Sequence, residues 1–465
     1  MTIGSTGPSE MSLARALARA SLAVDLGAFD VDVIAKAKIC LLDFLSCAFE
    51  ARHHAWSRQA IGIARGIENG ATIIGTSRLS TPGDAAFANA TLGHGLVRED
   101  MHAASICHHG VVLWPTLLAL SERTPLAGAT LLAAAIIGYE AGAQIGRALF
   151  TADLARLYRP TGLVAPLGAA LAGSYVLGLS EDAATSAVSI AANTSSGLNE
   201  WPHAGGSEMY FHPGFAARNA IAAIELAEAG AYASETIVEG EAGLFAAYRR
   251  EPAPAAIRLF AGRQPEIMAV YNKPAPACNF AQTAAQAALR AARDLAKSED
   301  IERILIRVPE AAVRYPGCNS KGPYRNALQA KMSIPFSVAA VLARGAIAED
   351  NYAQIDDPQI LGLVDLTDLE CDSGFTAAFP AQQGAEVVVS LRNGKTIRQR
   401  LDNVIAATPP EIRARFRQAA ADVVGDKRAL HLEVLVDSCE FLSDSRVIAA
   451  QCRLEPMERL LRPAS

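Results

Sequence analysis

The chain lacks the paired cysteines that mark metal-binding and disulfide-rich proteins. Its eight cysteines are scattered along 465 residues without one Cys-x-x-Cys pair. This spacing argues against a zinc ribbon and a disulfide framework, and it gives no support for an iron–sulfur cluster. Positive charge is scarce too, because 42 basic residues face 48 acidic ones, for a net charge of −6. With no basic excess to neutralise a phosphate backbone, we expect no nucleic-acid partner.

Uninterrupted apolar runs long enough to cross a membrane are also missing. Residues 131–145 come close, but Glu140 lies inside that run, and residues 162–179 are rich in Ala and Gly and contain Pro166. Ala and Gly contribute little to membrane insertion, so both segments predict buried, closely packed helices. The first ten residues are polar and lack the plan of a signal peptide. We therefore expect a cytoplasmic protein without membrane contact.

Helical periodicity dominates the first 250 residues. Half of all residues are apolar, which is enough for a large core. Apolar residues from Val33 to Ala48 recur at helical spacing after an expected N-cap at Asp30 or Asp32. Further helices are expected at residues 84–96, 111–122, 128–149, 163–177, 180–193 and 214–229. With no alternating strand pattern between them, these segments predict an all-helical bundle.

The pattern changes near residue 265. Residues 301–308 alternate between apolar and polar side chains, and so do residues 387–391 and 396–401, which flank the hairpin signal Asn393-Gly394. Helices are expected between these strands at residues 280–295 and 337–344, and after them at residues 410–423 and 443–461. The chain therefore predicts a mainly α fold, with a large helical domain of residues 1–268 and 406–465. A smaller α+β domain of residues 269–405 is inserted into it.

The densest concentration of reactive side chains lies between residues 94 and 110. Four of the nine histidines, His94, His102, His108 and His109, lie there beside the adjacent acids Glu99 and Asp100. Imidazole changes charge near neutral pH, and a neighbouring carboxylate orients it. An apolar run follows from Val111, so the cluster predicts an active-site rim that leads into a buried helix. The alternative is a solvated loop that happens to be rich in histidine.

Motifs of other enzyme classes are absent. The sequence has no Gly-x-Gly-x-x-Gly after a strand, no Walker segment and no Gly-x-Ser-x-Gly elbow. A metal site built from His102, His108 and Asp100 stays open at this point, because imidazole and carboxylate both bind divalent cations.

A series of short motifs, weak singly, becomes specific through its order and spacing. They are Asn89-Ala90 with His94, Glu99-Asp100-Met101-His102, His108-His109, Gly138-Tyr139-Glu140, Tyr158-Arg159-Pro160-Thr161-Gly162, His212-Pro213-Gly214, Glu239-Gly240, Lys273-Pro274 with Cys278, and Ala330-Lys331-Met332-Ser333-Ile334-Pro335. In this set the chain resembles the MmgE/PrpD family over nearly its whole length. Members of that family include 2-methylcitrate dehydratase, cis-aconitate decarboxylase and iminodisuccinate epimerase.

The resemblance implies a homodimer with an active site between a helical and an α+β domain. It also implies no metal and no organic cofactor. Four positions depart from the family pattern: Val97 replaces a usual acid, Arg159 a usual His, Met209 a usual Lys and Gln282 a usual His. These replacements leave the scaffold intact and bear on which reaction is catalysed.

The reactions of the family share removal of a proton from a carbon next to a carboxylate, which requires a placed base and cations near the developing negative charge. We expect His102 and His108 to act as base and acid, oriented by Asp100 or Glu99. Lys273 is expected to assist as a cation or base, and Tyr315 as a proton donor. Substrate-binding roles are expected for His94, His109, Arg159, His212 and Lys331.

Three functions follow as hypotheses. The first is a cofactor-independent hydro-lyase of the 2-methylcitrate dehydratase kind, acting on a small di- or tricarboxylate. The second is an epimerase of the iminodisuccinate type, which needs two opposed bases and no acid for a leaving group. The third is a catalytically inactive helical scaffold, which the four replaced positions motivate.

Overall fold

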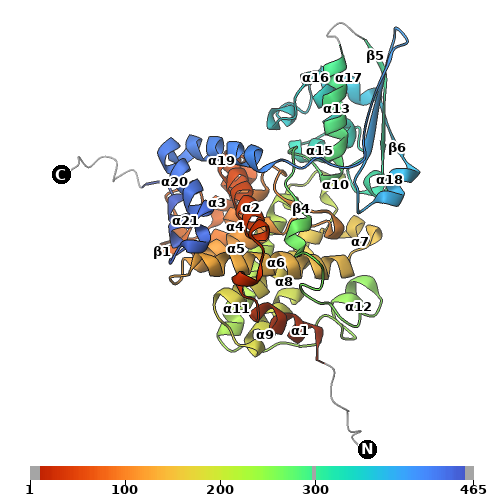
Figure 1. Ribbon diagram of the computed structural model, residues 1–465. Coiled ribbons are helices and arrows are strands. Elements are labelled where there is room, and N and C mark those ends of the chain that lie inside the picture. Colours follow the sequence, from red (N-terminus) through yellow and green to blue (C-terminus); the bar gives the residue numbers. More distant parts are fainter. Residues whose placement is uncertain (1–10, 296–299, 456–465) are drawn as a thin grey trace, which may run out of the picture.

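The apolar helices of the first 250 residues pack into one large bundle, and a smaller α+β unit lies at one end of it (Figure 1). The computed structural model describes residues 11–295 and 300–455. The mainly α class predicted from the sequence is confirmed. The borders of the two domains at residues 268 and 406 stay a prediction.

The centre of the bundle is a pair of long buried helices, α6 (Gly128–Leu149) and α8 (Pro160–Val176). They approach closely because small residues line their contact. A Cβ atom on Gly168 would lie only 2.5 Å from the carbonyl oxygen of Gly138, so this crossing requires glycine. Around the pair lie α4 (Pro82–His94), α5 (Gly110–Ser121), α9 (Glu181–Asn193) and α11 (His212–Glu228).

Helix α6 is long and apolar. Among the described residues it alone is long and apolar enough to span a membrane, yet 83% of its most apolar window is buried inside the protein. Its neighbours α5 and α8 supply that burial. The helix therefore lies in the core of the bundle, as the sequence predicts for residues 131–145.

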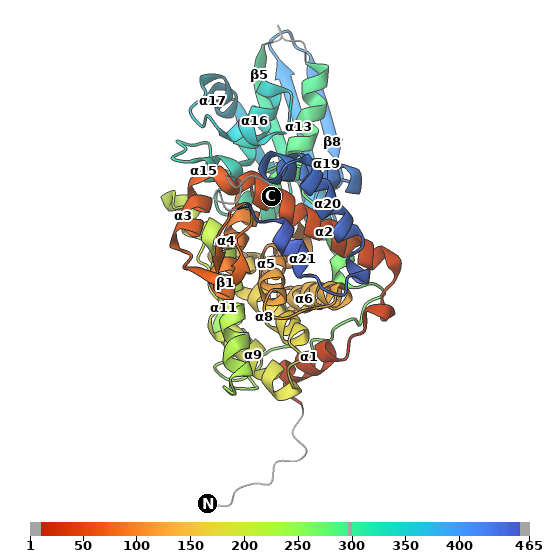
Figure 2. The ribbon, with the colours of Figure 1, turned by 90° about the vertical axis from the view of Figure 1, so that its left-hand side faces the viewer.

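The C-terminal helices return to the bundle. Helix α19 (Pro409–Val424) and helix α20 (Asp426–Asp437) pack against α2 (Val31–Glu50), and α21 (Arg446–Gln451) packs against α5. Figure 2 shows these blue helices beside the red α2. Helix α20 was not predicted, and α21 is shorter than the helix expected at residues 443–461. Residues 456–461 of that expected helix lie outside the described residues.

Two short strand pairs interrupt the helical domain and were not predicted. Strands β1 (Gly66–Thr72) and β2 (Leu79–Ser80) form one antiparallel pair. Strands β3 (Met101–His102) and β4 (Val270–Tyr271) form the other. The second pair is important for function because it fixes the histidine-rich segment against the chain that leads into the α+β unit.

The α+β unit is built on a four-stranded sheet with the order β6-β5-β7-β8. Its strands are β5 (Ile301–Val308), β6 (Thr367–Cys371), β7 (Ala385–Leu391) and β8 (Thr396–Leu401). The pair β5–β6 is parallel and the other pairs are antiparallel, and the predicted hairpin at Asn393-Gly394 is confirmed. Helix α13 (Gln282–Asp294) packs on β7 and β8, and α16 (Ile334–Arg344) packs on α13 and β6.

Helix α16 shows why its start differs from the expectation of residue 337. The Ser333 hydroxyl accepts a hydrogen bond from the Phe336 amide at 3.0 Å, and Pro335 occupies the first turn, where its missing N–H costs nothing. The N-cap therefore places the helix start at Ile334.

Candidate active site

A narrow cavity of about 30 Å³ lies between the helical bundle and the α+β unit. The bundle contributes Val97, Met101, Ile106, His108, Arg159 and Pro160, and the smaller unit contributes Cys278, Asn279, Phe280, Tyr315 and Met332. Of the residues predicted for the site, His108, Arg159 and Tyr315 line this cavity. We call it the inner cavity. The shared walls explain how segments more than 200 residues apart form one site.

His108 lies directly before helix α5 and has one free ring nitrogen. Its Nδ1 lies 2.9 Å from the Asp100 carbonyl oxygen and 3.0 Å from Oε1 of Glu99. Both neighbours are acceptors, so Nδ1 carries the proton, and in the neutral ring Nε2 holds a lone pair. Nε2 has no hydrogen-bond partner among the described residues. Burial lowers the pKa of His108, which favours the neutral, basic form.

Glu99 is the buried acid that joins two histidines. Its Oε1 accepts from His108 and, at 2.5 Å, from Nδ1 of His94. Burial alone would raise the pKa of Glu99, but the two imidazoles bring it well below its usual range. Burial lowers the pKa of His94 to about 4, so that ring is neutral at physiological pH. Its Nε2 then accepts a hydrogen bond from Nη2 of Arg159 at 2.7 Å.

Arg159 is a buried cation without a counter-ion. The residue is only 5% exposed, and no carboxylate among the described residues lies within ion-pair distance of it. Its Nε has no hydrogen-bond partner, and its guanidinium carbon lies 6.0 Å from the centroid of the Trp201 ring. A buried charge normally requires a partner, so this guanidinium in a cavity wall is prepared to receive an anion.

Lys273 lies behind the inner cavity and not in its wall. The residue is fully buried, and its Nζ donates to the carbonyl oxygen of Val97. Burial lowers the pKa of Lys273 to about 8. Val97 has a φ of 57°, in the left-handed region that β-branched residues avoid. This strained conformation points the Val97 carbonyl at Lys273 while the residue itself lines the cavity.

Tyr315 lines the inner cavity from the α+β side and carries a phenol group that can donate a proton. Burial raises its pKa to about 12, so the phenol stays protonated. Its ring packs against Phe280, with centroids 5.4 Å apart. Cys278 lies close by, and its sulfur is 3.6 Å from that of Cys318.

His102 and His109 lie outside the inner cavity, in a separate network. His102 Nε2 lies 2.9 Å from Glu266, and its Nδ1 lies 2.8 Å from the Ser105 hydroxyl, which in turn lies 3.0 Å from His109 Nε2. The Asp100 side chain also points elsewhere, because it accepts from the Tyr139 hydroxyl and from the Gly110 amide at 3.3 Å. Burial raises the pKa of Asp100 to about 7.

Lys331 and His212 complete the predicted residues. Lys331 is fully buried, but its Nζ is held by both Glu349 oxygens at 2.7 Å and by the Leu96 carbonyl oxygen at 3.0 Å. His212 begins helix α11 near Arg159, and its Nδ1 is buried without a partner. Burial lowers the pKa of His212 to about 3. Neither residue lines the inner cavity. Within residues 11–295 and 300–455, no group of three or more His, Cys, Asp and Glu side chains is arranged for a metal ion.

The four positions noted as departures gather around the inner cavity. Val97 and Arg159 line it, and the Met209 sulfur lies 2.8 Å from His94 Nε2. Gln282 braces the cavity loop that runs from Ala275 to Cys278. Its side chain accepts from the Ala275 amide at 2.9 Å and donates to the carbonyl oxygens of Ala275, Ala277 and Cys278.

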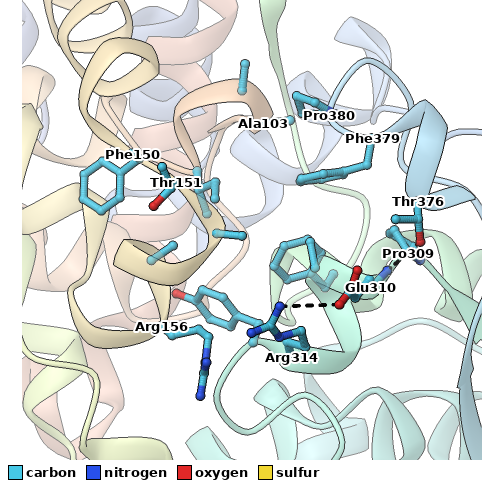
Figure 3. A pocket seen from close by; sticks show the side chains of 17 residues that line it. Ala103, Phe150, Thr151, Arg156, Pro309, Glu310, Arg314, Thr376, Phe379 and Pro380 are labelled. Atoms are coloured by element: carbon cyan, nitrogen blue, oxygen red, sulfur yellow. Dashed lines mark hydrogen bonds and ion pairs between the residues drawn. The ribbon is translucent and has the colours of Figure 1, made fainter. Parts of the chain in front are cut away.

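A second, larger cavity of about 320 Å³ adjoins the inner one and shares Ile106, Phe280 and Tyr315 with it. We call it the outer cavity. Figure 3 shows Phe150 and Thr151 of the bundle on one side and Pro309, Thr376, Phe379 and Pro380 of the α+β unit on the other. Sequence reasoning missed this cavity and the roles of Cys278, Asn279 and Phe280. The Lys273-Pro274 motif beside them was the available signal.

Comparison with known proteins finds two domains of one family along this chain. Residues 15–256 match the MmgE/PrpD N-terminal domain, and residues 275–440 match the MmgE/PrpD C-terminal domain. The chain therefore belongs to the MmgE/PrpD family.

Curated relatives extend the match over most of the chain. A cis-aconitate decarboxylase-like protein of Aspergillus oryzae is 27% identical over 446 residues, which cover 89% of this chain and 91% of the relative. The cis-aconitate decarboxylase of Aspergillus terreus is 24% identical, with 89% and 90% covered. The cis-aconitate decarboxylase of Homo sapiens is 27% identical, with 79% and 78% covered.

Proposed function

We propose that the protein is a lyase that acts on a small polycarboxylate through a carbanion formed next to a carboxylate. One observation carries the proposal: the unpaired buried Arg159 lies in the same cavity as the free Nε2 of His108. The guanidinium would hold a carboxylate of the substrate in a bidentate pair. His108 would then transfer the proton at the neighbouring carbon.

Decarboxylation is the form of this chemistry that the named relatives favour. Loss of CO2 from an unsaturated tricarboxylate leaves an electron pair that is delocalised toward the remaining carboxylate. Arg159 would stabilise that charge, and a protonated His108 would return a proton to carbon. In the resting state Nε2 of His108 is free, so it would first take up from solvent water the proton that it delivers to carbon in place of CO2.

Dehydration is the second candidate, and the neutral phenol of Tyr315 favours it. His108 would remove the α-proton, and Tyr315 would give its proton to the departing hydroxide. Epimerisation and an inactive scaffold stay as hypotheses. Epimerisation has weaker support, because among the described residues that line the inner cavity His108 is the one imidazole and no carboxylate is present.

We further propose a homodimer in the cytoplasm that works without a metal or organic cofactor, as the resemblance implies. In this scheme imidazole and phenol supply the proton transfers, and the guanidinium supplies the positive charge.

The test is an assay of a polycarboxylate panel in D₂O with three readouts. Released CO2 identifies a decarboxylase, and a new unsaturated acid without CO2 identifies a dehydratase. Deuterium uptake at the α-carbon without new ultraviolet absorbance identifies an epimerase. His108→Gln should abolish the reaction, and Arg159→Met should lower kcat/KM about 100-fold. His431→Gln, at an exposed histidine of α20, is the matched control. Failure of all substrates, or full activity in both site variants, would overturn the proposal.

A further inference from the structure

We propose that the substrate carries an apolar substituent of several carbons, and that this substituent occupies the outer cavity. The inference rests on the proposed function, because it adds a second part to the substrate of that site. It concerns the space beside the reacting groups and not the reacting groups themselves.

The two cavities differ about tenfold in volume. The inner cavity, at about 30 Å³, has room for little more than the carboxylate that Arg159 would bind. The outer cavity, at about 320 Å³, is in the range of cavities that hold small molecules. One water takes about 30 Å³ of liquid, so the outer space would accommodate a chain of several carbons.

The two cavities share part of their walls. Ile106, Phe280 and Tyr315 line both, so a substrate bound to Arg159 has the outer cavity as its neighbour. Ile106 is held at a φ of 52°, a left-handed conformation that β-branched residues avoid. The strained backbone fixes an apolar side chain at the boundary between the acid-binding and the outer space.

The walls of the outer cavity are apolar. Phe150, Ala155, Phe280, Pro309 and Phe379 line it, from the bundle on one side and the α+β unit on the other (Figure 3). Filling this space with an apolar group would remove aromatic surface from water and so lower the free energy of the complex.

The charged side chains around the outer cavity do not favour an anionic ligand, because they already pair with one another. Arg314 pairs with Glu310 and with Asp153, each at 3.4 Å, and Arg156 lies 4.0 Å from Asp153. These side chains are about half exposed and already neutralise one another at the mouth. Because their charges are satisfied, the apolar wall defines the occupant, and a second acidic group has no unpaired cation to meet there.

The experiment uses cis-aconitate and its homologues with a methyl, propyl or hexyl substituent. Each buried methylene should raise kcat/KM about two- to fourfold until the cavity is filled. Ala311→Phe places a ring in the cavity from α14 (Glu310–Arg314) and should remove this dependence on chain length. Ala414→Phe, at an exposed position of α19, is the matched control and should keep it.

Melting temperature in the presence of each acid gives a second readout that does not require turnover. Turnover of the unsubstituted acid with no gain, or a loss, along the series would overturn the inference and leave the proposed function standing. No turnover at all, with melting temperatures that rise with chain length and a rise abolished by Ala311→Phe, would support the apolar site and overturn the proposed reaction. A series that is equally steep in Ala311→Phe would also overturn the inference.

Discussion

Replacing Glu99 by glutamine tests the centre of the proposed site. The carboxylate lies beneath the inner cavity and accepts from two imidazoles through one oxygen, at 2.5 Å from His94 and 3.0 Å from His108. Its other oxygen, Oε2, is buried without a hydrogen-bond partner. Glutamine has nearly the same shape but carries no charge, so Glu99→Gln removes the charge and keeps the packing.

The expected magnitude follows from these contacts. If the amide oxygen takes the place of Oε1, the amide nitrogen lies where Oε2 had no partner, and an unsatisfied buried donor costs about 1–3 kcal/mol. Both imidazole hydrogen bonds also change from charge-assisted to neutral, which roughly halves their strength. A general base contributes about 10²–10⁴ to the rate, and its weakening should lower kcat about 10- to 100-fold.

The pKa of His108 fixes the direction in which the pH profile of activity should shift. In dehydration His108 must be neutral, so activity is lost as the pH falls through this pKa, and in decarboxylation it must be protonated, so activity is lost as the pH rises through it. Glu99 raises that pKa against the effect of burial. Removing the negative charge should therefore move the limb of the kcat/KM profile that His108 sets to lower pH in either reaction, while the maximum falls.

Glu266→Gln is the matched control, because Glu266 contacts His102 at 2.9 Å outside the inner cavity. It should lower stability in urea unfolding and leave kcat within about twofold of the wild-type value, below the effect expected of a general base. A limb set by His108 that moves to higher pH in Glu99→Gln, or an equal loss of kcat in both variants, would refute the role assigned to the Glu99–His108 pair.

Three further predictions concern single side chains. Arg159→Met should lower kcat/KM about 100-fold, through both KM and kcat, and should not lower the unfolding free energy of the ligand-free protein, because removal of a buried charge without a counter-ion offsets the loss of its hydrogen bond to His94. Asp100→Asn removes a carboxyl whose pKa is raised to about 7 by burial. Below pH 4 the wild-type carboxyl is protonated in both states, and between pH 4 and 7 only the folded state keeps the proton, so wild-type stability falls as the pH rises. Urea unfolding should then show the variant gaining up to about 4 kcal/mol on the wild type from pH 4 to pH 7.5, and an unchanged difference would contradict the shift. Gln282→Leu leaves the Ala275 amide and the Ala277 carbonyl oxygen of the Ala275–Cys278 loop without partners, so unfolding free energy should fall by about 2–4 kcal/mol and KM should rise. A stable Gln282→Leu variant with normal KM would show that the loop needs no brace.

Periodicity predicted the long elements of the fold well. Helix α6 has the expected bounds, and strand β5 and the Asn393-Gly394 hairpin lie where alternation placed them. The misses are elements stabilised by tertiary contacts. Strand β6 lies at the edge of the sheet, and helix α20 has apolar residues on its exposed side (Leu430, Val434) as well as its buried side, so its sequence shows no clear helical periodicity. Pairs as short as β3–β4 have too few residues for a pattern to emerge.

The sequence predicted which residue types form the candidate site better than it predicted where their side chains lie. The histidine-rich segment supplies His108 to the cavity, but its neighbours His102 and His109 point into another network. Side-chain direction in an irregular loop depends on its backbone angles, which the spacing of residues does not reveal. The spacing of residues does not reveal the position of the Lys331 side chain either. Its pairing with Glu349 depends on a contact between α15 (Ala327–Met332) and the 3-10 helix Glu349–Tyr352.

Two strained residues connect this geometry to its use. Val97 and Ile106 both have β-branched side chains and left-handed backbones, and both line the inner cavity. Such conformations cost about 1–3 kcal/mol each, and glycine at either position would avoid the cost. Glycine, however, would leave the cavity without an apolar side chain at that point. The left-handed conformations place the Val97 carbonyl against Lys273 and the Ile106 side chain at the border of the two cavities. We infer that the protein keeps these two conformations, despite their cost in stability, because they give the site its shape.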